Sequence, residues 1–152
     1  MIDPSGFEIL LKILVAILLG GVIGAERYFA DKPAGLRTHM IVAAAAALLV
    51  SSGDLVVGSF HYPQYMTADP IRIIEAVIVG ISFLGAGTIF KKRGENDVEG
   101  LTTGATILLT AGIGILVAVS QYLLAAAVTV LIVLIMYGLG YVEKRFLDRT
   151  ID

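Results

Sequence analysis

Cysteine is absent from the 152-residue chain. Its absence excludes disulfides, thiolate metal sites and catalysis by a thiol. Charge is scarce too, because Asp, Glu, Lys and Arg make up 16% of the residues, against about 25% in soluble domains. Motifs of P-loop nucleotide sites, zinc proteases and serine hydrolases are missing as well. We therefore expect no catalytic residues and no enzyme activity. The net charge of −2 gives no reason to expect nucleic acid as a partner.

Apolar residues are what the chain has in abundance. They make up 57% of the sequence, and the mean hydropathy is +0.89. A soluble protein of this size could not hide so many apolar side chains in its core. The run from Gly100 to Val142 contains 43 residues without Asp, Glu, Lys or Arg. As one helix it would be roughly 64 Å long, about twice the hydrocarbon core of a bilayer. It therefore predicts two membrane spans.

The whole chain reads as one transmembrane domain, residues 1–152, of the all-α class. We expect about five transmembrane helices, separated by polar loops, prolines and the polar pair Ser120-Gln121. The expected spans are Phe7–Ala25, Thr38–Val57, Pro70–Phe90, Leu101–Val119 and Tyr122–Val142. A cleaved signal peptide is the weaker reading of the first span, since Asp3 and Glu8 stand where a basic segment is expected.

The basic residues indicate the orientation. With five spans, nine of the 11 Lys and Arg residues lie on one side of the membrane, and only Lys12 and Arg72 lie on the other. We expect a protein of the inner membrane. The positive-inside rule then predicts that its N-terminus lies outside and its C-terminus lies in the cytoplasm. Lipid is therefore an expected partner.

The two expected cytoplasmic hairpins resemble each other. Gly24-Ala25 is followed by basic residues and then by Gly35-Leu36-Arg37-Thr38, whereas Gly85-Ala86 is followed by basic residues and then by Gly100-Leu101-Thr102-Thr103. We infer a parallel repeat of two helix pairs plus a fifth helix.

The mouths of these hairpins hold the first group of candidate binding residues: Glu26, Arg27, Arg37, Thr38, Thr102 and Thr103. Interfacial anchoring of the charged side chains explains them most simply. In a second interpretation, Glu26 pairs with Arg37 or Arg27, and the threonine hydroxyls cap helix N-termini or line a polar pocket. Such a pocket would suit phosphate-bearing headgroups or nucleotides, because helix N-termini favour anions.

The outer end of the third span holds the remaining candidates. Asp69 is expected to cap the helix, with Arg72 and Glu75 in its first two turns. A local ion pair explains the three charges. The alternative is an entry point for a cation, with Asp69 and Glu75 as weak candidates for binding Mg²⁺ through its waters; Arg72 argues against tight metal binding. The two histidines, His39 and His61, fall on opposite sides and form no shared metal site.

Glycine recurs along the spans, as in Gly20-x-x-x-Gly24. Small residues let helices approach closely in lipid. They can serve packing within one subunit, the seam of a dimer, or both, and we expect a homodimer.

Five blocks of sequence together resemble the MgtC/SapB family of bacterial and archaeal membrane proteins. The blocks are GGVIGAER (20–27), KPAGLRTHMIV (32–42), DPIRI (69–73), GISFLGAGTIFKK (80–92) and GLTTGATI (100–107). The resemblance implies a link to magnesium limitation and, in one branch, action on the ATP synthase or on transport ATPases rather than transport of Mg²⁺. By motif position, the signature charges of the family fall on Glu26, Arg27, Arg37, Asp69 and Arg72. Virulence-associated members carry a further soluble domain, so we expect this chain to be a short form.

Two functions stay open. The first is a regulatory protein that acts on another membrane complex in magnesium homeostasis and needs no cofactor other than, at most, Mg²⁺. The second is a transporter or channel for Mg²⁺ or another small solute, in which Ser82, Thr106 and Thr110 would line a neutral path. Charges gather at the membrane edges, whereas ion carriers usually place an ionisable site near the midplane. This favours the regulator.

Overall fold

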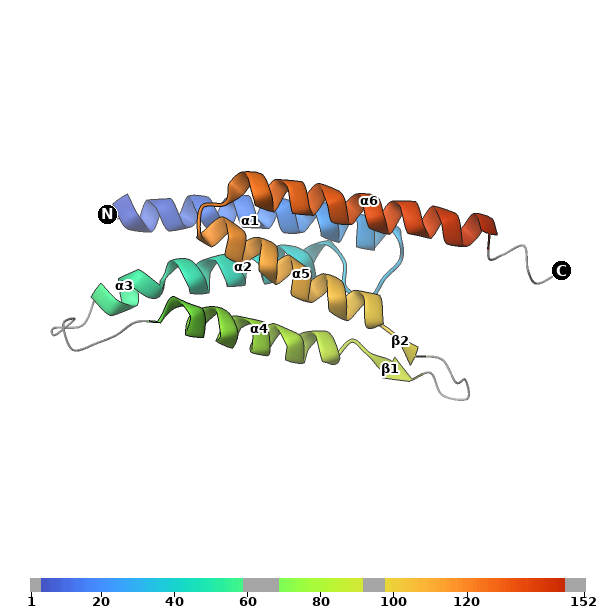
Figure 1. The fold of residues 1–152 in the computed structure, drawn as a ribbon, viewed down its shortest axis with the longest axis horizontal. Coiled ribbons are helices and arrows are strands. Elements are labelled where there is room, and N and C mark those ends of the chain that lie inside the picture. The colour runs from blue at the N-terminus through green and yellow to red at the C-terminus, as the bar shows by residue number, and fades with distance from the viewer. Residues whose placement is uncertain (1–3, 59–68, 92–97, 147–152) are drawn as a thin grey trace.

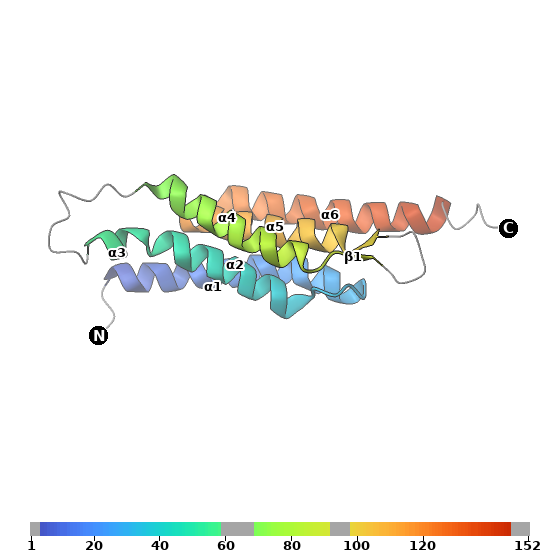
Figure 2. The ribbon, with the colours of Figure 1, turned by 90° about the horizontal axis from the view of Figure 1, so that it is seen from below.

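The computed structural model describes residues 4–58, 69–91 and 98–146. The long helices of these ranges, five in number, lie side by side and roughly parallel or antiparallel (Figures 1 and 2), so the all-α prediction is confirmed. The helices are α1 (Pro4–Phe29), α2 (Leu36–Ser51), the short α3 (Gly53–Gly58), α4 (Pro70–Ala86), α5 (Leu101–Ala118) and α6 (Tyr122–Phe146). Two-residue strands, β1 (Phe90–Lys91) and β2 (Val98–Glu99), pair antiparallel between α4 and α5.

Among the described residues, three helices are each long and apolar enough to cross a membrane: Ser5–Phe29, Leu101–Ala118 and Tyr122–Gly140. At 16 and 17 residues, α2 and α4 are shorter, so each spans only about 25 Å. α1 begins at one end of the bundle and α6 ends at the other (Figure 1). This arrangement fits an odd number of crossings.

Several helix ends differ from the predicted boundaries, and two helices end earlier than expected. The span expected to reach Val57 breaks at Ser52, whose hydroxyl donates to the carbonyl of Leu49 at 3.1 Å, and α3 then starts at Gly53. The span expected to reach Phe90 ends at Ala86 and is capped by Gly87. The predicted turn at Ser120-Gln121 is confirmed, since Ser120 adopts a φ of 62° between α5 and α6.

α5 is the central helix of the bundle. More than half of its span, 56%, is buried, against 17% for α1 and 11% for α6. One apolar cluster joins α5 to α1, α2 and α6 around Ile23, Ala43 and Ile113. A second cluster joins it to α2 and α4 around Ala46, Val77 and Ile107. The outer helices keep large apolar side chains exposed, as expected for surfaces that face lipid.

Small residues set the spacing of the helices. A Cβ built on Gly20 would lie 2.5 Å from the carbonyl oxygen of His39, and one on Gly24 would lie 2.7 Å from Cα of Leu36. Both glycines therefore face α2 of the same chain. Packing within the subunit, one of the two roles expected for Gly20-x-x-x-Gly24, is therefore observed. Gly85 and Gly104 pack in the same way between α4 and α5.

Candidate functional site

A buried ion pair lies at the mouth of the α1–α2 hairpin. α1 continues to Phe29, one turn beyond the expected end of the first span, so Glu26 and Arg27 both lie on the helix. Arg27 is only 4% exposed. Its Nη1 atom lies 3.6 Å from Oε2 of Glu26 and donates to Sδ of Met136 on α6 at 2.9 Å. The guanidinium group thus connects α1 to α6.

His39 of α2 is a further polar residue of this hairpin, and its side chain is fully buried. Its Nδ1 atom lies 3.0 Å from the carbonyl oxygen of Gly35, which also accepts the backbone N–H of His39 at 3.2 Å. Sequence reasoning assigned no role to His39. Its place as the one titratable residue in the apolar stretch of α2 beyond Thr38 was a signal that could have identified it.

Three atoms of this cluster are buried without a hydrogen-bond partner among the described residues: Oε2 of Glu26, Nε of Arg27 and Nε2 of His39. A buried polar atom without a partner is costly, and more so when it carries charge. Glu26, Arg27 and His39 are therefore the strongest candidates for functional residues in the described part of the chain. We call them the charged cluster.

The other residues predicted at the hairpin mouths do not join the charged cluster. Of the two partners predicted for Glu26, Arg27 is confirmed at 3.6 Å, whereas Arg37 is exposed and does not pair with it. The prediction that threonines cap the helices was also wrong. Glycines occupy the N-cap positions of α2 and α5, and neither N-cap has a side-chain hydrogen bond. Thr38 and Thr102 are exposed, whereas Thr103 is buried.

Gly100 shows why a glycine opens α5. Its φ of 89° lies in the left-handed region, and a Cβ there would collide with the carbonyl group of Thr88. The glycine therefore allows the chain leaving β2 to turn into α5 close beside the end of α4.

The outer candidates form a separate, exposed group at the other end of the bundle (Figure 1). Asp69 caps α4 as predicted, accepting the backbone N–H of Ile71 at 3.0 Å. Nε of Arg72 lies 3.9 Å from Oδ2 of Asp69, which confirms the local ion pair. Glu75 is exposed. Within the described ranges, no three His, Cys, Asp or Glu residues come together to hold a metal ion. His61 lies outside the described residues.

The proposed neutral path is not assembled. Ser82 is exposed on α4, whereas Thr106 and Thr110 are buried in α5. The hydroxyl of Thr106 donates to the carbonyl of Thr103 at 2.9 Å, and that of Thr110 to the carbonyl of Thr106 at 2.7 Å. These hydroxyls are therefore satisfied within their own helix.

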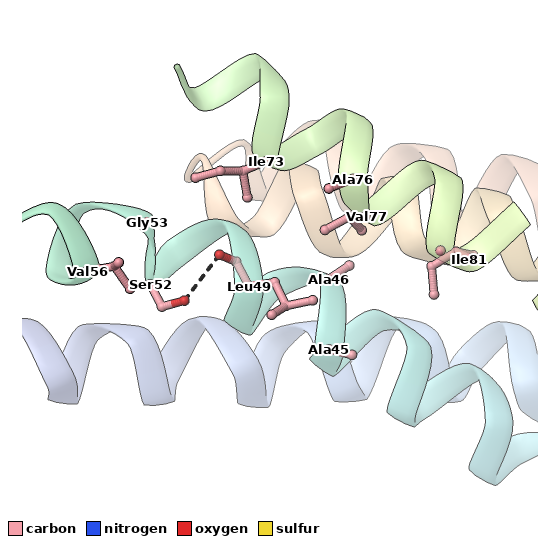
Figure 3. A pocket seen from close by; sticks show the side chains of 11 residues that line it. Ala45, Ala46, Leu49, Ser52, Gly53, Val56, Ile73, Ala76, Val77 and Ile81 are labelled. Atoms are coloured by element: carbon pink, nitrogen blue, oxygen red, sulfur yellow. Dashed lines mark hydrogen bonds between the residues drawn. The ribbon is translucent and has the colours of Figure 1, made fainter. Parts of the chain in front are cut away.

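An apolar groove of about 460 Å³ separates α4 from α2 and α3 (Figure 3). It is lined by Ala45, Ala46, Leu49, Ser52, Gly53, Val56, Ile73, Ala76, Val77, Gly80 and Ile81. The hydroxyl of Ser52 is bonded to the carbonyl of Leu49, so the groove offers almost no polar group. Its chemistry suits a hydrophobic occupant.

Comparison with known proteins places the chain in a family. The model of the MgtC family matches residues 13–145. The chain belongs to the MgtC family. It is 37% identical to protein SapB of Bacillus subtilis over 147 residues, which cover 95% of this chain and 60% of SapB. It is 41% identical to protein MgtC of Salmonella typhimurium over 129 residues, which cover 83% of this chain and 50% of that protein.

The chain thus spans about half to three fifths of the length of these relatives. No solved structure matches it significantly. Family membership and the apolar helices together establish a membrane protein of the MgtC type. The parallel repeat and the orientation in the membrane stay predictions.

Proposed function

We propose that this MgtC-type protein is a regulator linked to magnesium homeostasis, which acts in the inner membrane through contacts with another membrane complex. The observation that supports this proposal is that the buried threonine hydroxyls of the helices already have hydrogen-bond partners. The hydroxyls of Thr106, Thr110 and Thr129 are all bonded to carbonyls of their own helices. Among the described spans, no row of free polar groups leads from one end to the other.

The apolar groove supports the same function. α4 buries only Val77, Ile81 and Gly85 of its 17 residues, so its outer half is held loosely against the bundle. Small residues on both walls, among them Ala45, Gly53 and Gly80, would let an apolar partner helix approach closely. We propose that the chain lies with its N-terminus outside, its C-terminus in the cytoplasm, and as a homodimer.

A transporter for Mg²⁺ or another solute is the second candidate, and the charged cluster favours it. Ionisable residues buried within membrane spans often mark ion pathways. Arg27 within the cluster works against binding of a cation, however, because its positive charge would repel it.

Two experiments on the full chain separate these functions. Proteoliposomes loaded with a Mg²⁺ dye should report no flux above that of empty liposomes. A photo-crosslinking residue at Ala76, which lines the groove, should capture a membrane complex in cells grown at low Mg²⁺. The same residue at Val79, an exposed position of α4 outside the groove, should not.

A growth assay at low Mg²⁺ tests the same two positions. Ala76→Trp should abolish growth at low Mg²⁺ in cells that depend on this protein, whereas Val79→Trp should not. Mg²⁺ flux that disappears with Glu26→Gln or Asp69→Ala would instead establish transport and contradict the regulator.

A further inference from the structure

The guanidinium group of Arg27 is short of strong hydrogen-bond acceptors. Arg27 is only 4% exposed, and every arginine side chain carries several N–H donors. Its Nη1 atom lies 3.6 Å from Oε2 of Glu26, which is too far for a hydrogen bond. Nε of Arg27 is buried without a partner among the described residues. A buried cation in this position is stabilised by any strong acceptor that comes within its reach.

The acceptor that Arg27 does have is the thioether of Met136. Nη1 donates to Sδ at 2.9 Å across the interface between α1 and α6. A thioether sulfur is a weak acceptor, but it is also the atom of methionine that oxidants attack. Addition of one oxygen atom turns it into a sulfoxide, which is polar and accepts hydrogen bonds through that oxygen. The contact therefore places an oxidisable sulfur beside a donor that suits its oxidised form.

A small oxidant can reach this sulfur. Met136 is half-buried, and the next residue, Tyr137, is 74% exposed. The contact lies in the last turn of α1, at the hairpin mouth, where the side chain of Glu26 is 14% exposed. Hydrogen peroxide is small, uncharged and soluble in water, so it can enter such a site from the aqueous phase.

Met40 of α2 offers a matched comparison within the same chain. It is half-buried like Met136. Its Sδ atom lies against Gly21, 3.8 Å from the position that a Cβ would take there. Among the described residues, no hydrogen bond joins it to a charged group. Oxidation of Met40 would therefore place a polar oxygen against an apolar helix surface. Met1 and Met66 lie outside the described residues.

We propose that Met136 is a site of reversible oxidation and that Arg27 binds the sulfoxide. The oxidant is hydrogen peroxide. A lone pair of the sulfur attacks one peroxide oxygen and the O–O bond breaks. That oxygen stays on the sulfur, and the other leaves as water with both protons, so the sulfur is oxidised and the peroxide is reduced. The methionine side chain is flexible, which allows the new oxygen to turn toward Nη1 or Nε of Arg27.

Oxidation at this position tightens the contact between α1 and α6. A methionine sulfoxide normally disrupts packing, because it brings a polar group into an apolar contact. Here its oxygen meets a buried cationic donor, so a charge-assisted hydrogen bond replaces a weak one. α6 is only 11% buried in its span, so one strong link matters to how it is held. Methionine sulfoxide can be reduced enzymatically, which makes the change reversible. The inference applies to a regulator and to a transporter alike.

The first test oxidises the full chain in detergent. Met40→Leu with Met66→Leu leaves Met136 as the only methionine besides Met1. Peroxide should add one oxygen to the Met136 fragment, detected by mass spectrometry, and should raise the midpoint of unfolding in an SDS titration. The comparison protein, Met66→Leu with Met136→Leu, keeps Met40 and should be destabilised by the same treatment.

Three outcomes of this test would overturn the proposal. The first is a midpoint that stays the same or falls when Met136 is oxidised in the presence of Arg27. The second is a Met136 that peroxide oxidises only after the protein has unfolded. The third is an equal rise of the midpoint in the protein that keeps Met40, since the stabilisation would then owe nothing to Arg27.

The second test needs no oxidant. Glutamine resembles methionine sulfoxide, because its side-chain carbonyl places a strong acceptor near the position of Sδ, whereas leucine has no acceptor. The stability of Met136→Gln relative to Met136→Leu should be greater with Arg27 than in the Arg27→Met background, by about tenfold in the unfolding equilibrium constant. Loss of the partner of Glu26 is common to both Arg27→Met proteins, so it cancels.

Equal differences in the two backgrounds would show that Arg27 does not recognise the acceptor, and would refute the proposal. If Arg27→Met does not fold, the peroxide test decides, because both of its proteins keep Arg27. Neither measurement involves Mg²⁺ or a partner, so failure here is distinct from failure of the proposed function.

Discussion

Replacing Gly114 with alanine tests whether close contact between α2 and α5 holds the bundle together. A Cβ at this position would overlap the carbonyl oxygen of Ala43 and lie 2.9 Å from Cβ of Ala46. The first neighbour is a backbone atom and the second is a Cβ atom fixed to the backbone, so neither can rotate away. The two helices would have to separate along their shared face.

Gly112 is the matched control. It lies two residues away on the same helix, and a Cβ there would meet nothing within 4 Å. Alanine favours a helix over glycine by about 0.8–1.0 kcal/mol, so Gly112→Ala should be neutral or stabilising. Gly114→Ala gains the same propensity but adds a methyl group to a filled contact, which typically costs about 1–3 kcal/mol. Loss of the contacts around Ala43, Ala46 and Ala111 adds to this cost.

We expect Gly114→Ala to be less stable than Gly112→Ala by about 2 kcal/mol in the free energy of unfolding. The measurement is unfolding of the detergent-solubilised full chain, monitored by helical circular dichroism over an SDS titration. Equal stability of the two variants would refute the argument that α5 packs against α2 through Gly114.

Two further predictions concern the charged residues. Arg27→Ala should lower the free energy of unfolding by about 3 kcal/mol, because it leaves Glu26 as a buried charge without its partner. Arg37→Ala, at an exposed position, should change the free energy of unfolding little. Similar losses for both variants would contradict the observed pairing. Asp69→Ala should lower the free energy of unfolding by about 1 kcal/mol, because the α4 cap is lost. Glu75→Ala, on the same exposed turns, serves as the control in the same SDS titration. An unchanged midpoint for Asp69→Ala would argue against the cap.

Much of the fold could be predicted from the sequence because its signals are local. Apolar runs of sufficient length predict spans whatever surrounds them, since the backbone must satisfy its hydrogen bonds internally in lipid. Ser120-Gln121 and Asp69-Pro70 mark helix boundaries through residues adjacent in the chain, and both were confirmed. The boundaries at Ser52 and Ala86 were missed because both lie inside apolar segments, where hydropathy continues past the end of the helix.

The candidate site was only half visible in the sequence. Glu26 and Arg27 could be named because charges at the end of an apolar run are conspicuous. Which base Glu26 pairs with depends on how far α1 continues and which way it turns, so Arg37 was an equally good candidate before the fold was known. His39 became a candidate only when the packing of the helices buried its side chain completely and left its Nε2 atom without a hydrogen-bond partner among the described residues.

By itself, the sequence determined that this protein crosses a membrane, roughly where its helices begin and end, and which charges stand at their ends. Only the tertiary structure decided which helix is central. α6 has the higher mean hydropathy, 2.5 against 1.9 for α5, yet α5 is 56% buried and α6 only 11%. The reason is physical: lipid is as apolar as a protein core, so hydropathy does not distinguish a side chain that faces lipid from one that faces another helix. Close packing of small residues makes that distinction, and it becomes visible only when the helices are assembled.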